Sequence, residues 1–154
     1  MDTLYLLLKF IHIAAVIVWV GGLFALVVLN ARVAGTGDAA ARATLGSQSE
    51  YFGRVVIGPA MGLTLLAGLA TAGRIGFPFS STWIVWGLIG FVLSVFLGAV
   101  AIPRAGTALG AAARSAGPND PRVANLARRL GLLSALNILI LASVVWAMVF
   151  KPTL

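Results

Sequence analysis

Four long apolar runs alternate with polar, arginine-containing segments along this chain. Each run provides roughly the 20 residues that an α-helix needs to cross the hydrocarbon core of a bilayer. The pattern therefore predicts an all-α fold, a four-helix transmembrane bundle, built from a single integral membrane domain over residues 1–154. The expected spans cover residues 4–29, 55–72, 83–102 and 130–150.

Proline and hydroxyl residues mark the expected limits of the inner two spans. Pro59 suits the first turns of the second span, and Pro103 is expected to end the third. Residues 80–82 (Ser-Ser-Thr) are good N-caps for the third. Between the first and second spans, residues 38–52 can form an interfacial helix.

The last connection contains a strong turn signal at residues 118–121, Pro-Asn-Asp-Pro. Asp120 can cap a helix there, and Pro121 suits the first helical position. The fourth helix is therefore expected to begin at about residue 121, well before its apolar run.

Composition and charge support a membrane protein rather than a soluble one. Hydrophobic residues make up 60% of the chain and charged residues 10%, and the mean hydropathy is +1.04. A soluble domain needs more polar surface than this. The net charge of +7 comes from arginines beside apolar runs without interleaved aromatic residues. The lipid bilayer is therefore the expected partner and nucleic acid is not, while a homo-oligomer or a membrane-complex partner remains open.

The basic residues are distributed unequally between the two sides of the expected spans. The segments 30–54 and 104–129 together contain eight arginines, whereas Lys9, Arg74 and Lys151 lie on the opposite side. The positive-inside rule then places both termini outside the cytoplasm. The first run follows no basic segment and precedes no clear cleavage site, so it is expected to be a retained span and not a signal peptide.

Small residues predict close helix packing in the two middle spans. On the third span they recur at helical spacing and form a stripe of Gly87, Gly90, Ser94 and Gly98. On the second span the corresponding residues are Gly58, Gly62 and Gly68.

The only histidine of the chain, His12, lies inside the first apolar run, where ionisable residues are costly and usually have a role. Lys9 and Trp19, three and seven residues away, share its helix face. A structural imidazole bonded to a Ser, Thr or Asn on another helix is one interpretation. A metal ligand to haem iron is another, and proton relay or copper contact is a third. A copper site is disfavoured because one His and three scattered Met offer too few clustered soft ligands.

Other polar residues also allow two interpretations. Lys9 either extends its ammonium to the interface or neutralises an anion beside His12. Lys151 either complements the negative end of the last helix or contacts the same ligand, as an anion partner or weak axial ligand. Asn137 is expected to make an interhelical bond. The chain shows no acid pair inside a span, no nucleophilic triad and no phosphate-binding loop, so no catalytic residue is predicted.

Two stretches carry a family resemblance, Lys9-x-x-His12-x6-Trp19-x-Gly21-Gly22-Leu23-Phe24 and Met148-Val149-Phe150-Lys151-Pro152. They resemble small bacterial integral membrane proteins of unknown function. That family is distantly similar to the membrane domain of copper-resistance protein D and to HemJ-type protoporphyrinogen IX oxidase, a haem-binding membrane protein. The resemblance implies a bacterial inner (cytoplasmic) membrane location and functional roles for Lys9, His12, Lys151 and Pro152.

The chain departs from the HemJ-type pattern after Phe24, where a Pro-Arg pair and a second His would follow. Residues 26–30 read Leu-Val-Val-Leu-Asn. This departure argues against oxidase activity and leaves haem binding as the implied property.

The leading hypothesis is a small integral membrane protein that binds haem b, with or without redox activity. His12 would be the axial metal ligand, and Lys9, Lys151 and Trp19 would contribute to the cofactor site. The alternative is a non-catalytic membrane subunit or a small transporter-like protein. In that case His12 and Lys9 are structural or conduct protons. The sequence does not decide whether the protein is an enzyme.

Overall fold

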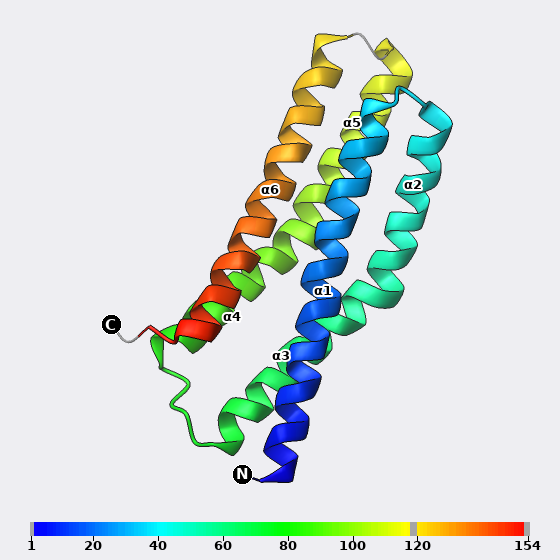
Figure 1. The fold of residues 1–154 in the computed structure, drawn as a ribbon. Coiled ribbons are helices and arrows are strands. Elements are labelled where there is room, and N and C mark those ends of the chain that lie inside the picture. The colour runs from blue at the N-terminus through cyan, green and yellow to red at the C-terminus, as the bar shows by residue number, and fades with distance from the viewer. Residues whose placement is uncertain (1, 118–119, 153–154) are drawn as a thin grey trace. The chain divides into compact units, whose positions relative to one another are not determined.

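A computed structural model describes residues 2–117 and 120–152, and within these residues it contains helices and turns but no strand. The turn residues Pro118 and Asn119 lie outside the described part. The elements, shown in Figure 1, are α1 (Thr3–Gly35), α2 (Ala39–Phe52), the π-helix η1 (Gly53–Ile57), α3 (Gly58–Arg74), α4 (Thr82–Phe96), the π-helix η2 (Leu97–Ala101), α5 (Ile102–Ala116) and α6 (Pro121–Phe150).

Four continuous helices are long and apolar enough to cross a membrane, which confirms the all-α class and the number of spans. They are Thr3–Gly35, Ala40–Arg74, Thr82–Ala116 and Pro121–Phe150, with lengths of 33, 35, 35 and 30 residues. A span needs only about 20 residues, so each helix continues well beyond the hydrocarbon core. Large apolar side chains such as Phe10, Ile17, Leu66 and Leu139 are exposed, as expected for surfaces that face lipid.

The two middle helices continue through the prolines at which the sequence placed span limits. Proline has no N–H and clashes with the carbonyl four residues earlier, so it usually ends or kinks a helix. Here a π-turn precedes each proline. The Gly58 N–H bonds the Gly53 carbonyl, and the Ile102 N–H bonds the Leu97 carbonyl. The wider turn accommodates Pro59 and Pro103 without ending the helix. As a result, α2 continues into α3 as one long helix, and the interfacial position of residues 38–52 stays a prediction.

The start of α6 confirms the prediction at Asp120 and Pro121. The Arg122 N–H donates to Asp120 Oδ1 at 2.7 Å, and Pro121 occupies the first helical turn. Asp2 and Asp38 cap α1 and α2 in the same way. At α4, Ser81 occupies the N-cap position, where its backbone carbonyl accepts the N–H groups of Ile84 and Val85.

The chain divides into two compact units, one ending at Phe79 and the other beginning at Ser80. In the first unit α1 packs against α3, and the Arg74 Nε donates to Asp2 Oδ2 at 2.7 Å, which joins the end of α3 to the start of α1. In the second unit α6 packs against α4 and α5. The prediction of one membrane domain stays a prediction.

Each unit has one main contact line between membrane helices. We call the α1–α3 contact the first seam, defined by His12, Trp19, Thr64 and Gly68. We call the α4–α6 contact the second seam, defined by Gly87, Gly90, Ser94 and Asn137. All of these residues are buried except His12 and Gly68, which are half-buried. The small residues allow the helix backbones to approach closely.

Candidate functional site

His12 lies on the first seam and bonds to α3. Its Nδ1 is 2.8 Å from the backbone carbonyl oxygen of Thr64. The carbonyl can only accept, so this hydrogen bond assigns the proton to Nδ1. The structural interpretation anticipated a bond to a Ser, Thr or Asn. The partner is a Thr, but its backbone carbonyl makes the contact, because the Thr64 hydroxyl donates to the Ala60 carbonyl at 2.9 Å.

Gly68 makes room for the imidazole. A Cβ at this position would lie 2.8 Å from His12 Cε1 and 2.9 Å from Nδ1, closer than side-chain carbons approach. Thr64 and Gly68 are four residues apart and therefore share one face of α3. The sequence identified Gly68 as a packing residue without assigning His12 as its partner, and it gave no signal for the Thr64 carbonyl.

The second ring nitrogen of His12, Nε2, takes no part in the bond to Thr64. When Nδ1 carries the proton, Nε2 keeps its lone pair. In the described part of the chain, no donor bonds to Nε2. A backbone carbonyl bonded to Nδ1 fixes both the tautomer and the ring orientation, and this arrangement is common at metal-ligating histidines.

Lys9 lies one helical turn before His12 on α1 and is exposed. Its Nζ lies 5.8 Å from the centre of the Tyr5 ring. No described acid forms an ion pair with it. Lys9 therefore offers a cation one turn from His12 that pairs with no carboxylate among the described residues.

Trp19 is only 4% exposed and lies two turns after His12 on the same face of α1. Its burial makes it part of the packed core of the first unit. Gly22, in the next turn of α1, lies close to other side chains of the first unit. A Cβ there would lie 3.2 Å from Phe52 and 3.5 Å from Ile57. A Cβ on Gly21 would meet nothing within 4 Å.

Lys151 belongs to the second unit, where it ends α6. It adopts a left-handed backbone with φ of 47°, and its N–H bonds the Ala147 carbonyl at 2.9 Å. Its Nζ lies 5.4 Å from the centre of the Trp83 ring. These contacts support the structural role at the helix end.

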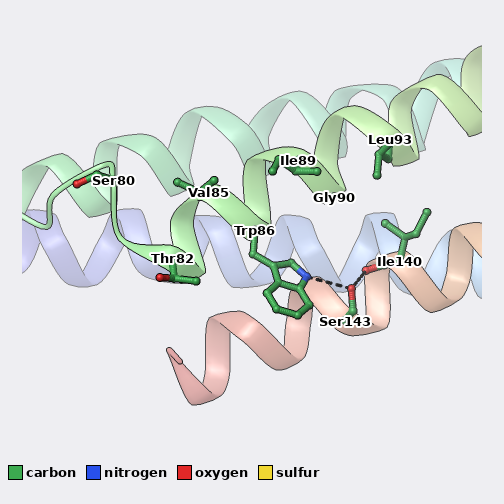
Figure 2. A pocket seen from close by; sticks show the side chains of 9 residues that line it. All are labelled: Ser80, Thr82, Val85, Trp86, Ile89, Gly90, Leu93, Ile140 and Ser143. Atoms are coloured by element: carbon green, nitrogen blue, oxygen red, sulfur yellow. Dashed lines mark hydrogen bonds between the residues drawn. The ribbon is translucent and has the colours of Figure 1, made fainter. Parts of the chain in front are cut away.

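A groove of about 460 Å³ lies along α4 and α6 of the second unit (Figure 2). The Trp86 Nε1–H donates to Ser143 Oγ at 3.3 Å, and Ser143 donates to the Ile140 carbonyl at 2.7 Å. No lining residue is titratable, so the groove offers no acid–base chemistry. Its lining residues are Ser80, Thr82, Val85, Trp86, Ile89, Gly90, Leu93, Ile140 and Ser143.

Two buried oxygen atoms on the second seam have no hydrogen-bond partner in the described part of the chain. They are Ser94 Oγ and Asn137 Oδ1, in residues that are each 3% exposed. Gly90 lies against Ile140 and Val144, so continuing along the antiparallel helices places Ser94 and Asn137 on the same contact line. The interhelical bond expected for Asn137 is not formed through this oxygen.

The donor set for a metal is a single imidazole. Among the described residues there is no group of three or more His, Cys, Asp or Glu side chains that could hold an ion. A protein-only metal site needs several such ligands, whereas haem iron needs only one or two axial ligands because the porphyrin supplies the others. A single imidazole therefore fits haem iron better than a bare copper ion.

The all-helical fold and the four apolar helices define this chain as an integral membrane protein. It belongs to the DUF2269 family of predicted integral membrane proteins, whose profile matches residues 6–152. Neither a curated protein nor a solved structure matches the chain. Membership in this family carries no assigned activity.

Proposed function

We propose that this protein binds haem b in the membrane, with Nε2 of His12 as an axial ligand to the iron. The observation that supports the proposal is the His12 Nδ1–Thr64 carbonyl contact of 2.8 Å. It holds the ring in the tautomer that has its lone pair on Nε2, where no described group competes for it. The Gly68 backbone supports the imidazole from one side.

Lys9 is the proposed partner for a haem propionate, because its ammonium lies one turn from His12 without an acidic partner. Trp19 is proposed as a wall of the site, whereas Lys151 belongs to the second unit, and its contact with a bound cofactor stays a prediction of the family resemblance. Bound haem would supply one-electron redox chemistry. The protein's own contribution would be to orient the imidazole and to balance the propionate charge.

The alternative is a non-catalytic membrane subunit or a small transporter-like protein in which His12 joins α1 to α3 or conducts protons. A structural role for His12 is supported by the same hydrogen bond and by the close packing of its ring against Gly68. The structural role needs only Nδ1, whereas haem binding also needs the lone pair on Nε2.

His12→Asn separates these functions. An asparagine amide nitrogen takes nearly the position of Nδ1 and can donate to the Thr64 carbonyl, but the variant has no ring lone pair. We expect wild-type protein purified after expression with added haem precursor to show a Soret band. We expect His12→Asn to fold with similar thermal stability and to lack the band, and Lys9→Ala to bind haem more weakly.

The matched control is Asn137→Leu, a polar-to-apolar change in the second unit, which should retain the Soret band. Wild-type protein that remains colourless after reconstitution with hemin would overturn haem binding. An equal Soret band in His12→Asn would reject His12 as the ligand.

A further inference from the structure

Three arginines border the apolar membrane segments at one end of the α5–α6 pair. Arg104 directly follows Pro103, where the apolar run of the third membrane helix ends, and Arg128 and Arg129 directly precede the apolar run of α6. All three side chains are exposed. We call these residues the boundary arginines.

The helix geometry places the boundary arginines at similar depth. The α5 and α6 helices pack together (Figure 1), and only residues 117–120 separate them in the sequence. Arg104 lies 12 residues before the end of α5 at Ala116, which is about 18 Å from the turn. Arg128 and Arg129 follow Pro121 by seven and eight residues, or about 10–12 Å. The three residues therefore fall within about a turn and a half of helix, beside the lipid-facing segments.

These charges lack acidic partners inside the second unit. From Ser80 onward, the only acidic residue of the sequence is Asp120. Its carboxylate accepts the Arg122 backbone N–H at the start of α6. The first unit differs, because Arg54 pairs with Glu50 and Arg74 pairs with Asp2. No described acid forms an ion pair with a boundary arginine.

We propose that the boundary arginines form a binding site for the phosphate headgroup of an anionic phospholipid. A guanidinium can bind two phosphate oxygens at once, and arginine is well suited to phosphate recognition. The apolar segments beside the site would contact the acyl chains, which distinguishes a lipid from a free anion. The site is independent of haem binding at His12.

Arg114 and Arg122 provide a matched control. Both are exposed, and both lie within two residues of the turn, about 3 Å or less along the helix axes. They are therefore about 8–15 Å farther from the apolar segments than the boundary arginines. Separations of this size approach or exceed the screening length in physiological salt, so their effect on a bound headgroup should be small.

The test measures lipid binding to the full-length protein in a neutral detergent, by native mass spectrometry and by the shift in melting temperature. Phosphatidylglycerol is expected to bind and stabilise, and phosphatidylcholine is not. Replacing all three boundary arginines with glutamine should weaken phosphatidylglycerol binding on the order of 100-fold. The Arg114→Gln, Arg122→Gln double variant should change it by less than about threefold.

Circular dichroism checks that the triple variant folds. If it does not, Arg104→Gln alone and the Arg128→Gln, Arg129→Gln pair should each weaken binding, by roughly fivefold and 25-fold. Equal binding of phosphatidylcholine would overturn the proposal. It would also be overturned if inorganic phosphate stabilised the protein as much as the lipid does, or if the control variant lost as much affinity as the triple variant. A failed Soret test at His12 would leave this result unaffected.

Discussion

The first and second seams bring membrane helices together in different ways. On the first seam a polar side chain crosses between helices, and its partner is a backbone carbonyl, as the His12–Thr64 contact shows. On the second seam glycines allow close approach, and two buried polar atoms, Ser94 Oγ and Asn137 Oδ1, have no described partner. The first seam therefore orients a chemical group, whereas the second mainly provides close packing.

The hydroxyl groups of the membrane helices show the same contrast between the two seams. Thr64, Thr71 and Ser143 each donate to a carbonyl of their own helix three or four residues earlier. This bond is the usual way to satisfy a hydroxyl in an apolar helix. Ser94 does not make it, so the second seam carries a polar cost that the first seam avoids.

The largest expected effect follows from overpacking the second seam. A Cβ on Gly90 would overlap Val144, so Gly90→Leu should lower the free energy of unfolding by about 1–3 kcal/mol or more. Ser94→Leu, at a buried position, should act in the same direction. Thermal unfolding in detergent measures both effects.

Gly98→Leu is the control for this prediction. Gly98 belongs to the same small-residue stripe in the sequence, but it is exposed and a Cβ there meets nothing within 4 Å. Its melting temperature should remain near that of the wild type. If Gly90→Leu were equally harmless, the α4–α6 contact described for the second unit would be wrong.

A smaller effect is expected on the first seam. Gly68→Ala places a methyl group 2.8 Å from His12 Cε1, so the imidazole must move and its bond to Thr64 must weaken. We expect a loss of about 1–2 kcal/mol in unfolding free energy. Gly62→Ala, on the same helix with open space around it, should cause little change. Equal stability of the two variants would contradict the packing of His12 on Gly68.

Local sequence patterns predicted most of the fold, but of the candidate site they identified the side chains and not the backbone contacts that hold His12. The four apolar runs, the Asp120–Pro121 helix start and the packing of Gly87 and Gly90 depend on neighbouring residues and helical spacing, so the sequence reveals them. Helical spacing could not resolve the role of Gly98. The buried residue that follows Gly87, Gly90 and Ser94 on α4 is Leu97, and Gly98 is exposed.

The remaining features depend on contacts that sequence spacing does not encode. The Thr64 carbonyl is a backbone group 52 residues from His12, and every residue has such a group. Proline normally signals the end of a helix, so the sequence could not show that π-turns carry the chain past Pro59 and Pro103. The candidate site was therefore predicted from the His12 side chain alone, and the contacts that hold this side chain were revealed only by the structure.

Asn137→Leu sharpens the contrast between the seams with a gain in stability. Leucine has a similar size and removes the buried Oδ1, which has no described partner. We expect the free energy of unfolding to rise by about 1 kcal/mol. The comparison is Leu141→Ala, which should be less stable than the wild type because it creates a cavity at a residue that is only 1% exposed. Thermal unfolding of both variants measures the two changes in stability on the same scale. A destabilised Asn137→Leu protein would mean that this oxygen accepts a bond in the native membrane.

The smallest effect concerns the ion pair that joins the ends of α1 and α3. The Leu4 N–H, and then the Arg74 guanidinium, hold the pKa of Asp2 below its ordinary value of 3.8. A lowered pKa in the folded state means that the carboxylate adds stability above about pH 4, and that this is lost as the pH falls through the folded pKa. Both side chains are about half exposed, so solvent screens the pair and the gain is small. Asp2→Asn should therefore melt slightly below the wild type at pH 7, and the two melting temperatures should converge as the pH falls below the folded-state pKa of Asp2. A difference that persists unchanged where Asp2 is fully protonated would show that the charge of Asp2 is not linked to folding.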